Sequence, residues 1–381
     1  MDFALSQADR EVAELAKRLA HTELAPRAAA VDAGQFPLEG LKILAQHGLM
    51  GIKISKEFGG LGAGMVAHVA AIRELAAVCP STAVTLAVTN MVADMIEKFG
   101  TADQKQRYIG PIVDGSYPAA AFALSETGAG SDAASLRTRA VKVDGGWQIT
   151  GSKMWITSGD RAGVVLVMAK TDPDKGARGI TAFLVEPSWP GFEVGRHEEK
   201  LGLRGSSTVS LNFSEMVVPD SAQLGNLGQG FEIAMVALDG GRCGIGAQAL
   251  GMGYAVLAAT AKALNERAAL DKQLGLDQNA QFRLADMATE LDAAWLLVVR
   301  AAWLRDTGKK MTREAAMAKV VATEAGDSAC KIALQILGVA ALDARHPVSR
   351  ALRDVRVSRI YEGTSEIQRL VVARILAASV A

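Results

Sequence analysis

The feature that most constrains this chain is a block of short β-rich segments placed between two long helical blocks. The β-rich block spans residues 118–228. Its strand-like segments are Trp147–Thr150, Val164–Ala169, Thr181–Val185 and Ser207–Phe213. In the last of these, every second residue from Val209 to Phe213 is apolar and the residues between are polar, which is typical of a half-buried strand. Because helices do not alternate with these strands, we do not expect a doubly wound α/β sheet.

The blocks on either side show helical periodicity. In the first, residues 1–117, Ser6 and Asp9 form a capping signature before apolar residues at helical spacing. Helices are expected there at 37–48, 65–78, 82–99 and 103–114. In the third block, residues 229–381, they are expected at 229–267, 279–307, 312–338, 347–360 and 365–378. The order therefore predicts an α domain, then a small β domain, then an α-helical bundle.

Composition excludes several classes of partner. The 381 residues are half apolar, so the chain can bury a large core in two or three units. Lys+Arg and Asp+Glu both total 41, so no net charge draws the chain to nucleic acid or to an anionic membrane. Cys79, Cys243 and Cys330 are far apart and fit buried thiols of a reducing compartment. No signal peptide or apolar run of about 18 residues is present, so we expect a cytoplasmic protein without a membrane span.

Two segments of the middle block carry glycines, hydroxyls and an aromatic residue. In FALSETGAGSD (122–132), Gly128 and Gly130 expose backbone N–H groups beside Ser and Thr hydroxyls, a combination suited to phosphate or flavin oxygens. A surface loop before a strand has the same composition. In GSKMWITSG (151–159), Trp155 could stack on a planar ring or be an ordinary core residue.

The glycine-rich segment LDGGRCGIGAQALG (238–251) imitates a dinucleotide fingerprint, but it follows a helix rather than a strand. Its glycines are therefore interpreted as sites of close helix packing. Asp239 and Arg242 share a helix face, either as a surface ion pair or as a ligand site. The five histidines show no ligand spacing, so no metal site is expected.

Near the C-terminus, IYEGTSEIQ (360–368) contains a glutamate in the break between two helices. Ser365 and Gln368 read as a capping box for the second helix, which leaves Glu362 and Gly363 in the break. From the residues alone, Glu362 is either a solvated charge answering nearby arginines or a carboxylate placed for chemistry.

Taken together, these segments resemble the acyl-CoA dehydrogenase flavoenzyme family, of its short-chain or branched-chain type. The matching stretches, in order, are FALSETGAGSD, GSKMWITSG, KLGLRGSST, GRCGIGAQALG, QFRLADM and RIYEGTSEIQRLVVAR. The resemblance implies an α+β fold: an N-terminal α-helical domain (1–117), a middle antiparallel β domain (118–228) and a C-terminal four-helix bundle (229–381). It also implies a homotetramer.

The resemblance further implies FAD as cofactor and an acyl-CoA thioester as substrate. The positions that match flavin contacts are Phe122, Leu124, Ser125, Gly130, Ser131, Trp155, Ile156, Thr157, Thr364 and Glu366. Those assigned to the substrate are Ser131, Asp239, Arg242 and Gly363. Glu362 falls on the catalytic carboxylate, which removes the α-proton while a hydride leaves the β-carbon. Since the chain has no haem or iron–sulfur ligand set, electron-transferring flavoprotein is the implied electron acceptor.

Departures from the family pattern fall on one inter-subunit flavin contact. Arg267, Gln278, Gln335 and Gly338 match the family there. The three residues at 269–271 replace a Gln-Phe-Gly, and Val339 replaces a second glycine, which adds a Cβ where backbone approaches the cofactor. Weak FAD binding or an altered oligomer interface is the resulting hypothesis.

Other functions on the same fold stay open. They are an oxidase acting on carrier-tethered acyl groups, a flavin monooxygenase, and a scaffold without cofactor; the monooxygenase has no need of Glu362. Residues 78–95 are expected to line the acyl pocket and contain no arginine, which weighs against a dicarboxylic acyl-CoA unless Arg73 or another segment supplies one.

Overall fold

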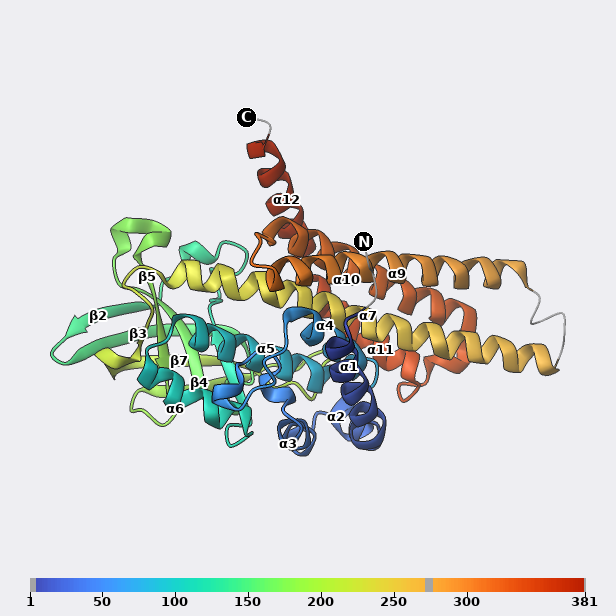
Figure 1. Ribbon diagram of the computed structural model, residues 1–381, viewed down its shortest axis with the longest axis horizontal. Helices are drawn as coiled ribbons and strands as arrows, with labels where there is room; N and C mark the ends of the chain where they lie inside the picture. Colours follow the sequence, from blue (N-terminus) through green and yellow to red (C-terminus); the bar gives the residue numbers. More distant parts are fainter. Residues whose placement is uncertain (1–4, 271–276, 380–381) are drawn as a thin grey trace.

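The computed structural model describes residues 5–270 and 277–379, which form, in chain order, a helical region, one sheet and a second helical region. In Figure 1 the sheet lies toward the left end of the molecule. The N-terminal helices are α1 (Gln7–Leu19), α2 (Ala28–Asp32), α3 (Leu38–Gln46), α4 (Met65–Ala76), α5 (Pro80–Phe99) and α6 (Ala102–Val113). Ser6 begins α1 as predicted, because its hydroxyl accepts a hydrogen bond from the Asp9 N–H at 3.1 Å. Thr101 and Gln104 form a full capping box at α6.

The sheet has eight strands. They are β1 (Ala119–Ala123), β2 (Arg139–Val143), β3 (Gly146–Thr157), β4 (Ala162–Lys170), β5 (Ile180–Val185), β6 (Phe192–His197), β7 (Thr208–Pro219) and β8 (Gln223–Leu224). The order along the sheet is β6-β7-β3-β2-β4-β5-β8, with β1 paired to β4. The expectation of an antiparallel sheet holds for most pairs but is wrong for β1–β4 and β2–β4, which are parallel. The sequence pattern did not reveal β1, β2, β6 or β8.

The C-terminal helices are α7 (Gly230–Leu270), α9 (Gln278–Asp306), α10 (Thr312–Leu337), α11 (Pro347–Val355) and α12 (Ser365–Ser379). In Figure 1, α7, α9 and α10 run side by side away from the sheet, and α12 extends out of the body. The prediction that glycines on α7 allow close packing is confirmed, because a Cβ at Gly246 would meet Val298 at 3.1 Å and Ala322 at 3.3 Å. These contacts hold α7 against α9 and α10.

By length and composition alone, α7 and α10 are apolar enough to cross a bilayer. The most apolar window is 72% buried inside the protein for α7 and 44% for α10. Each helix also packs against the other. Their apolar residues therefore serve the bundle core.

Two local expectations near the C-terminus need correction. The helix expected at 347–360 ends at Val355 and continues as a 3-10 turn, Arg356–Arg359. Ser365 does not cap α12, because the hydroxyl that accepts from the Ile367 N–H, at 3.3 Å, belongs to Thr364. Gln368 instead donates to the carbonyls of Glu362 and Gly363 at 3.2 and 3.0 Å. The three cysteines are buried and free, as expected.

Candidate active site

Glu362 lies in a tight bend between the 3-10 turn and α12. Its φ of 53° and the φ of 91° at Gly363 place two consecutive residues in the left-handed region. A non-glycine residue is costly there, so the surrounding contacts must hold it. Gln368 supplies two such contacts, and Lys319 of α10 supplies a third by donating from Nζ to the Gly363 carbonyl at 2.8 Å. The bend aims the Glu362 side chain at α7.

The Glu362 carboxyl group packs directly on α7 at Gly241. A Cβ at Gly241 would overlap Oε2 of Glu362, so only glycine leaves room for the carboxyl group. The residue as a whole is half-buried, but Oε2 is shielded from solvent and has no hydrogen-bond partner among the described residues. Burial raises the pKa of Glu362 to about 7, although the charges of Lys319, Arg242 and Lys53 oppose the rise. Glu362 is therefore not the solvated surface charge of the alternative interpretation.

Lys319 supports Glu362, although its role was not predicted from the sequence. It is fully buried, and burial lowers its pKa to about 8 against the opposing charge of Glu362. The sequence signal for this burial was a single lysine within the otherwise apolar stretch AAMAKVVA of α10. Lys319 thus both fixes the bend, through Gly363, and places a positive charge near the carboxylate.

Replacing Lys319 by Met is expected to shift the titration of Glu362 upward. A positive neighbour favours the ionised carboxylate, so its loss raises the pKa of Glu362. The acid limb of a kcat/KM–pH profile should move to higher pH. Lys331→Met is the control, since Lys331 lies on the same helix, is half exposed and pairs with Asp327 at 2.7 Å. Coincident profiles for the three proteins would contradict the role of Lys319.

Asp239 and Arg242 form the predicted ion pair, with the nitrogen and oxygen 2.6 Å apart. The pair is buried rather than on the surface, because the Arg242 side chain is only 6% exposed and that of Asp239 18%. Thr312 donates to the second Asp239 oxygen at 2.6 Å, while Nε of Arg242 lacks a partner among the described residues. A buried guanidinium with a free N–H can donate to a polar ligand.

The two predicted flavin segments lie together in the β domain. The Met154 N–H donates to the Ser125 carbonyl at 2.9 Å, which joins the end of β3 to the loop after β1. Buried Lys153 strengthens the junction, because its Nζ contacts the Leu124 carbonyl at 3.0 Å and Glu126 at 2.8 Å. Lys153 and Glu126 therefore position both segments, although neither residue was assigned a role from the sequence.

Trp155 is exposed although it belongs to a long strand. Its side chain is 56% exposed and its φ is 62°, so the backbone turns the indole outward instead of into the sheet. The alternative interpretation, that Trp155 is an ordinary core residue, is wrong. Ile156 and Leu124 are buried, Phe122, Ser125 and Thr157 are half-buried, and Gly130 and Ser131 are exposed.

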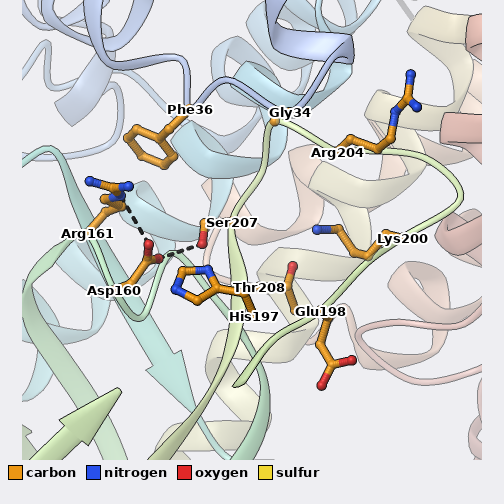
Figure 2. A pocket seen from close by; sticks show the side chains of 11 residues that line it. Gly34, Phe36, Asp160, Arg161, His197, Glu198, Lys200, Arg204, Ser207 and Thr208 are labelled. Atoms are coloured by element: carbon orange, nitrogen blue, oxygen red, sulfur yellow. Dashed lines mark hydrogen bonds and ion pairs between the residues drawn. The ribbon is translucent and has the colours of Figure 1, made fainter. Parts of the chain in front are cut away.

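The pocket in Figure 2 is lined by residues other than Glu362 and the flavin segments. Its lining residues are Gly34, Phe36, Asp160, Arg161, His197, Glu198, Lys200, Arg204, Gly205, Ser207 and Thr208. Asp160 is occupied by Arg161 at 3.0 Å and by the Ser207 hydroxyl at 2.6 Å, and Lys200 donates to the Ser206 carbonyl. None of the predicted site residues lines it. Within the described residues, no group of three or more His, Cys, Asp or Glu is arranged to hold a metal ion.

The chain matches three family profiles that together cover most of its length. They are "Acyl-CoA dehydrogenase, N-terminal domain" over residues 6–116, "middle domain" over 121–216 and "C-terminal domain" over 228–377. The chain belongs to the acyl-CoA dehydrogenase family. It is therefore an FAD-dependent oxidoreductase that acts on acyl-CoA thioesters.

Individual relatives agree over nearly the whole length. Acryloyl-CoA reductase (NADH) of Anaerotignum propionicum is 41% identical over 377 residues, which is 98% of this chain and 95% of the relative. Butyryl-CoA dehydrogenase from Megasphaera elsdenii is 38% identical, with a TM-score of 0.96 and coverage of 99% and 100%. A chain described as electron transferring flavoprotein of Acidaminococcus fermentans, in work on flavin-based electron bifurcation, is 38% identical, with a TM-score of 0.96 and 99% coverage of both.

The observed residues fit FAD, as this acyl-CoA dehydrogenase requires. An outward-facing indole at Trp155 offers a stacking surface for a planar ring. At Gly128 and Gly130 a Cβ would meet nothing within 4 Å, so the loop leaves open space beside its N–H groups and hydroxyls. Thr364 is half-buried and Glu366 is exposed at the start of α12, near the Glu362 bend.

The remaining predicted cofactor residues lie at the other end of the bundle. Arg267 donates to the Ile336 and Leu337 carbonyls at 2.9 and 3.0 Å, which brings it beside Gln335 and Gly338. Figure 1 places this end of α7 and the start of α9 away from the sheet, and Gln278 is the first residue of α9. Within one chain these residues do not join the flavin segments. Val339 is 84% exposed there, while Asp271 and the side chains of residues 269 and 270 lie outside the described part.

Proposed function

We propose that Glu362 is the base that removes the α-proton of an acyl-CoA thioester. The observation that carries this is a buried carboxyl oxygen with no hydrogen-bond partner in the described part of the chain, in a group whose pKa is raised to about 7. Such a group exchanges a proton readily near neutral pH, whereas an ordinary exposed glutamate would be too weak a base.

The chain's other residues position this base and the substrate. Gly241 gives the carboxyl group its place on α7, and Lys319 with Gln368 holds the backbone bend. Arg242, held by Asp239, offers its free N–H to the polar part of the CoA thioester, together with the exposed hydroxyl of Ser131. Gly363 is assigned to the substrate through its place next to the base.

FAD, when bound, accepts the hydride that leaves the β-carbon. The residues proposed to hold it are those of the two β-domain segments, with Trp155 against the ring, and Thr364 and Glu366 from α12. A neighbouring chain would supply Arg267, Gln278, Gln335 and Gly338, since these lie apart from the flavin segments in one chain.

The direct test is a panel of straight, branched, cyclic and dicarboxylic acyl-CoA thioesters added to the FAD-loaded enzyme without an external acceptor. Loss of flavin absorbance with formation of the 2-enoyl thioester is expected for at least one short substrate. The absence of bleaching by every member would contradict the proposed reaction. A relative named acryloyl-CoA reductase makes the reverse direction worth measuring with the corresponding enoyl thioester.

The pH dependence should follow Glu362. A base works in its ionised form, so kcat/KM should be level above pH 7 and fall about tenfold per unit below it. The expected midpoint is about 7, provided the substrate does not titrate in this range. A profile that stays level down to pH 5 would show that another group takes the proton.

We also propose electron-transferring flavoprotein as the electron acceptor. Support comes from the similarity to the Acidaminococcus chain studied with that flavoprotein. Reduction of added electron-transferring flavoprotein by substrate-reduced enzyme would test it, with NAD⁺ as the competing acceptor.

Assembly into a homotetramer remains our proposal. Large apolar side chains are exposed on α9 and beside α10, namely Phe282, Leu296, Trp303, Val339 and Leu342. The projecting α12 adds exposed Leu370 and Leu376. A second copy of the chain is the occupant proposed, because Arg267 and Gln335 need a partner's flavin. Analytical ultracentrifugation distinguishes a tetramer from a monomer.

The altered residues near Val339 predict weak FAD retention. The exposed valine adds a Cβ where backbone is expected to approach the cofactor. Wild-type protein should lose part of its flavin on gel filtration, and Val339→Gly should retain more. Full stoichiometric FAD of ordinary affinity in the wild type would defeat this hypothesis.

A further inference from the structure

Three glycines give α7 an open face beside the proposed base. Gly240, Gly241 and Gly244 share this face, because residues three and four apart on a helix lie one above the other. A Cβ at Gly240 would overlap Arg305, and one at Gly241 would overlap Glu362. At Gly244 a Cβ would lie 3.7 Å from Nε2 of His68 and 4.0 Å from Ala87. Three ionisable side chains therefore surround one short stretch of bare backbone.

His68 is a buried imidazole that the proposed reaction does not use. It comes from α4 and is 3% exposed, and its Nδ1 is shielded from solvent without a hydrogen-bond partner in the described part of the chain. Burial lowers its pKa well below the ordinary value, so the ring is neutral. The other ring nitrogen, Nε2, faces the open space at Gly244, so in the tautomer that carries the proton on Nε2 it can donate to a ligand placed there.

A buried charge cluster adjoins His68. Lys53 contacts Asp94 with nitrogen and oxygen 3.0 Å apart, and Arg305 contacts the same Asp94 oxygen. The side chains of Lys53, Arg305 and Asp94 are 8%, 20% and 17% exposed, respectively. All three charges act on the pKa of His68, and Lys53 also acts on that of Glu362. Arg305, Glu362 and His68 also meet α7 within one turn of one another, at Gly240, Gly241 and Gly244, so the cluster adjoins both groups.

The two cations of the cluster contact a single carboxylate. Lys53 and Arg305 share that of Asp94. The second carboxylate nearby, that of Asp306, balances the formal charge, but its two oxygens accept from the Met65 and Val66 N–H groups at 2.6 and 3.0 Å at the N-terminus of α4. A ligand carboxylate would give the two cations a second direct anionic partner.

We infer that the far end of the acyl group lies against His68 and the Lys53–Asp94–Arg305 cluster, and that the substrate is a short dicarboxylic acyl-CoA. This rests on the proposed function, which puts the α-carbon at Glu362. Gly241 and Gly244 are separated by about 4.5 Å along the helix axis, close to the reach of roughly three carbon–carbon bonds. A chain of about five carbons therefore brings its second carboxylate from Glu362 to His68.

The inference revises the expectation drawn from residues 78–95. That segment supplies no arginine, but Arg305, at the end of α9, and Lys53, before α4, supply two cations from other parts of the chain. A methyl end would leave the Nε2 of His68, which faces Gly244, and the cations without a new partner. A carboxylate accepts from Nε2–H, in the tautomer that carries the proton there, and lies next to both cations.

The test compares three five-carbon thioesters on the FAD-loaded wild-type enzyme. Glutaryl-CoA, pentanoyl-CoA and 5-hydroxypentanoyl-CoA differ only at the far end, which is anionic, apolar or neutral and polar. The rate constant for flavin bleaching divided by the half-saturating concentration should be at least tenfold higher for glutaryl-CoA than for pentanoyl-CoA. Equal or better use of either neutral substrate would overturn the inference.

Two variants locate the effect. His68→Leu should lower the glutaryl-to-pentanoyl ratio at least tenfold, since leucine cannot donate to a carboxylate and suits an apolar end. Arg305→Met, which leaves Lys53 to pair with Asp94, should lower the ratio in the same direction and serves if His68→Leu does not fold. Arg345→Gln is the control, because Arg345 is 91% exposed. An unchanged ratio in both variants would contradict the site.

The outcomes separate this inference from the proposed function. If pentanoyl-CoA or butyryl-CoA bleaches the flavin and glutaryl-CoA does not, only the substrate class is wrong. If no thioester bleaches the flavin, the proposed function itself fails.

Discussion

Replacing Glu362 by Gln is expected to lower kcat for acyl-CoA dehydrogenation about 10⁴-fold while leaving fold and thioester binding intact. The amide has nearly the same shape, so it still fits over Gly241, but it cannot accept the α-proton at neutral pH. Stopped-flow bleaching gives the rate, and the spectral shift on thioester addition gives the affinity. Turnover within tenfold of wild type would show that Glu362 is not the base.

The same variant should be more stable than the wild type at alkaline pH. The pKa of Glu362 is raised from 4.5 to about 7 in the folded chain, so the unfolded chain ionises first as pH rises. Stability is therefore lost between those two values, and the full cost, up to roughly 3 kcal/mol, is present above pH 7. Glu362→Gln removes this cost. Denaturant unfolding at pH 8 should show the gain, and at pH 4.5 the two proteins should differ little.

Much of the architecture follows from local pattern. The long helices of the bundle were predictable because a run such as α10 repeats small apolar residues over many turns between clear ends. Strand β1, AAAFA, was not, because alanine has low strand propensity and the segment gains its place from pairing with β4. Its parallel register is a tertiary property that no local pattern reveals.

The site was predictable where a residue type departs from its surroundings. Glu362 was found because it lies beside a glycine in the break between two predicted helices, and the family resemblance gave it a role. Lys319 and His68 were not found, because their importance depends on burial next to Glu362 and Gly244, which are distant in the sequence. The buried cluster of Lys53, Asp94 and Arg305 likewise joins three separate segments. Charges that look ordinary in the sequence become informative only when the fold removes them from water.

Replacing Gly241 by Ala is expected to lower kcat at least about 100-fold without unfolding the protein. The added Cβ would overlap the Glu362 Oε2 atom, so the carboxyl group must move. A displacement of about 1 Å is enough to cost two orders of magnitude in a proton transfer that depends on orientation. The backbone itself tolerates alanine, because Gly241 is helical and has no left-handed φ. Bleaching kinetics with a short acyl-CoA measure the loss.

A matched glycine separates this steric effect from a general effect of alanine. Gly110 also lies within a helix, α6, and a Cβ there would meet nothing within 4 Å. Gly110→Ala should keep full activity and gain up to about 1 kcal/mol of stability, because alanine favours the helix. If Gly241→Ala also kept normal kcat, the Glu362 carboxyl group could not react from its place on α7. If kcat falls in Gly241→Ala and not in Gly110→Ala, catalysis depends on the absence of a side chain at Gly241, which lets the buried Glu362 carboxylate lie against the backbone of α7.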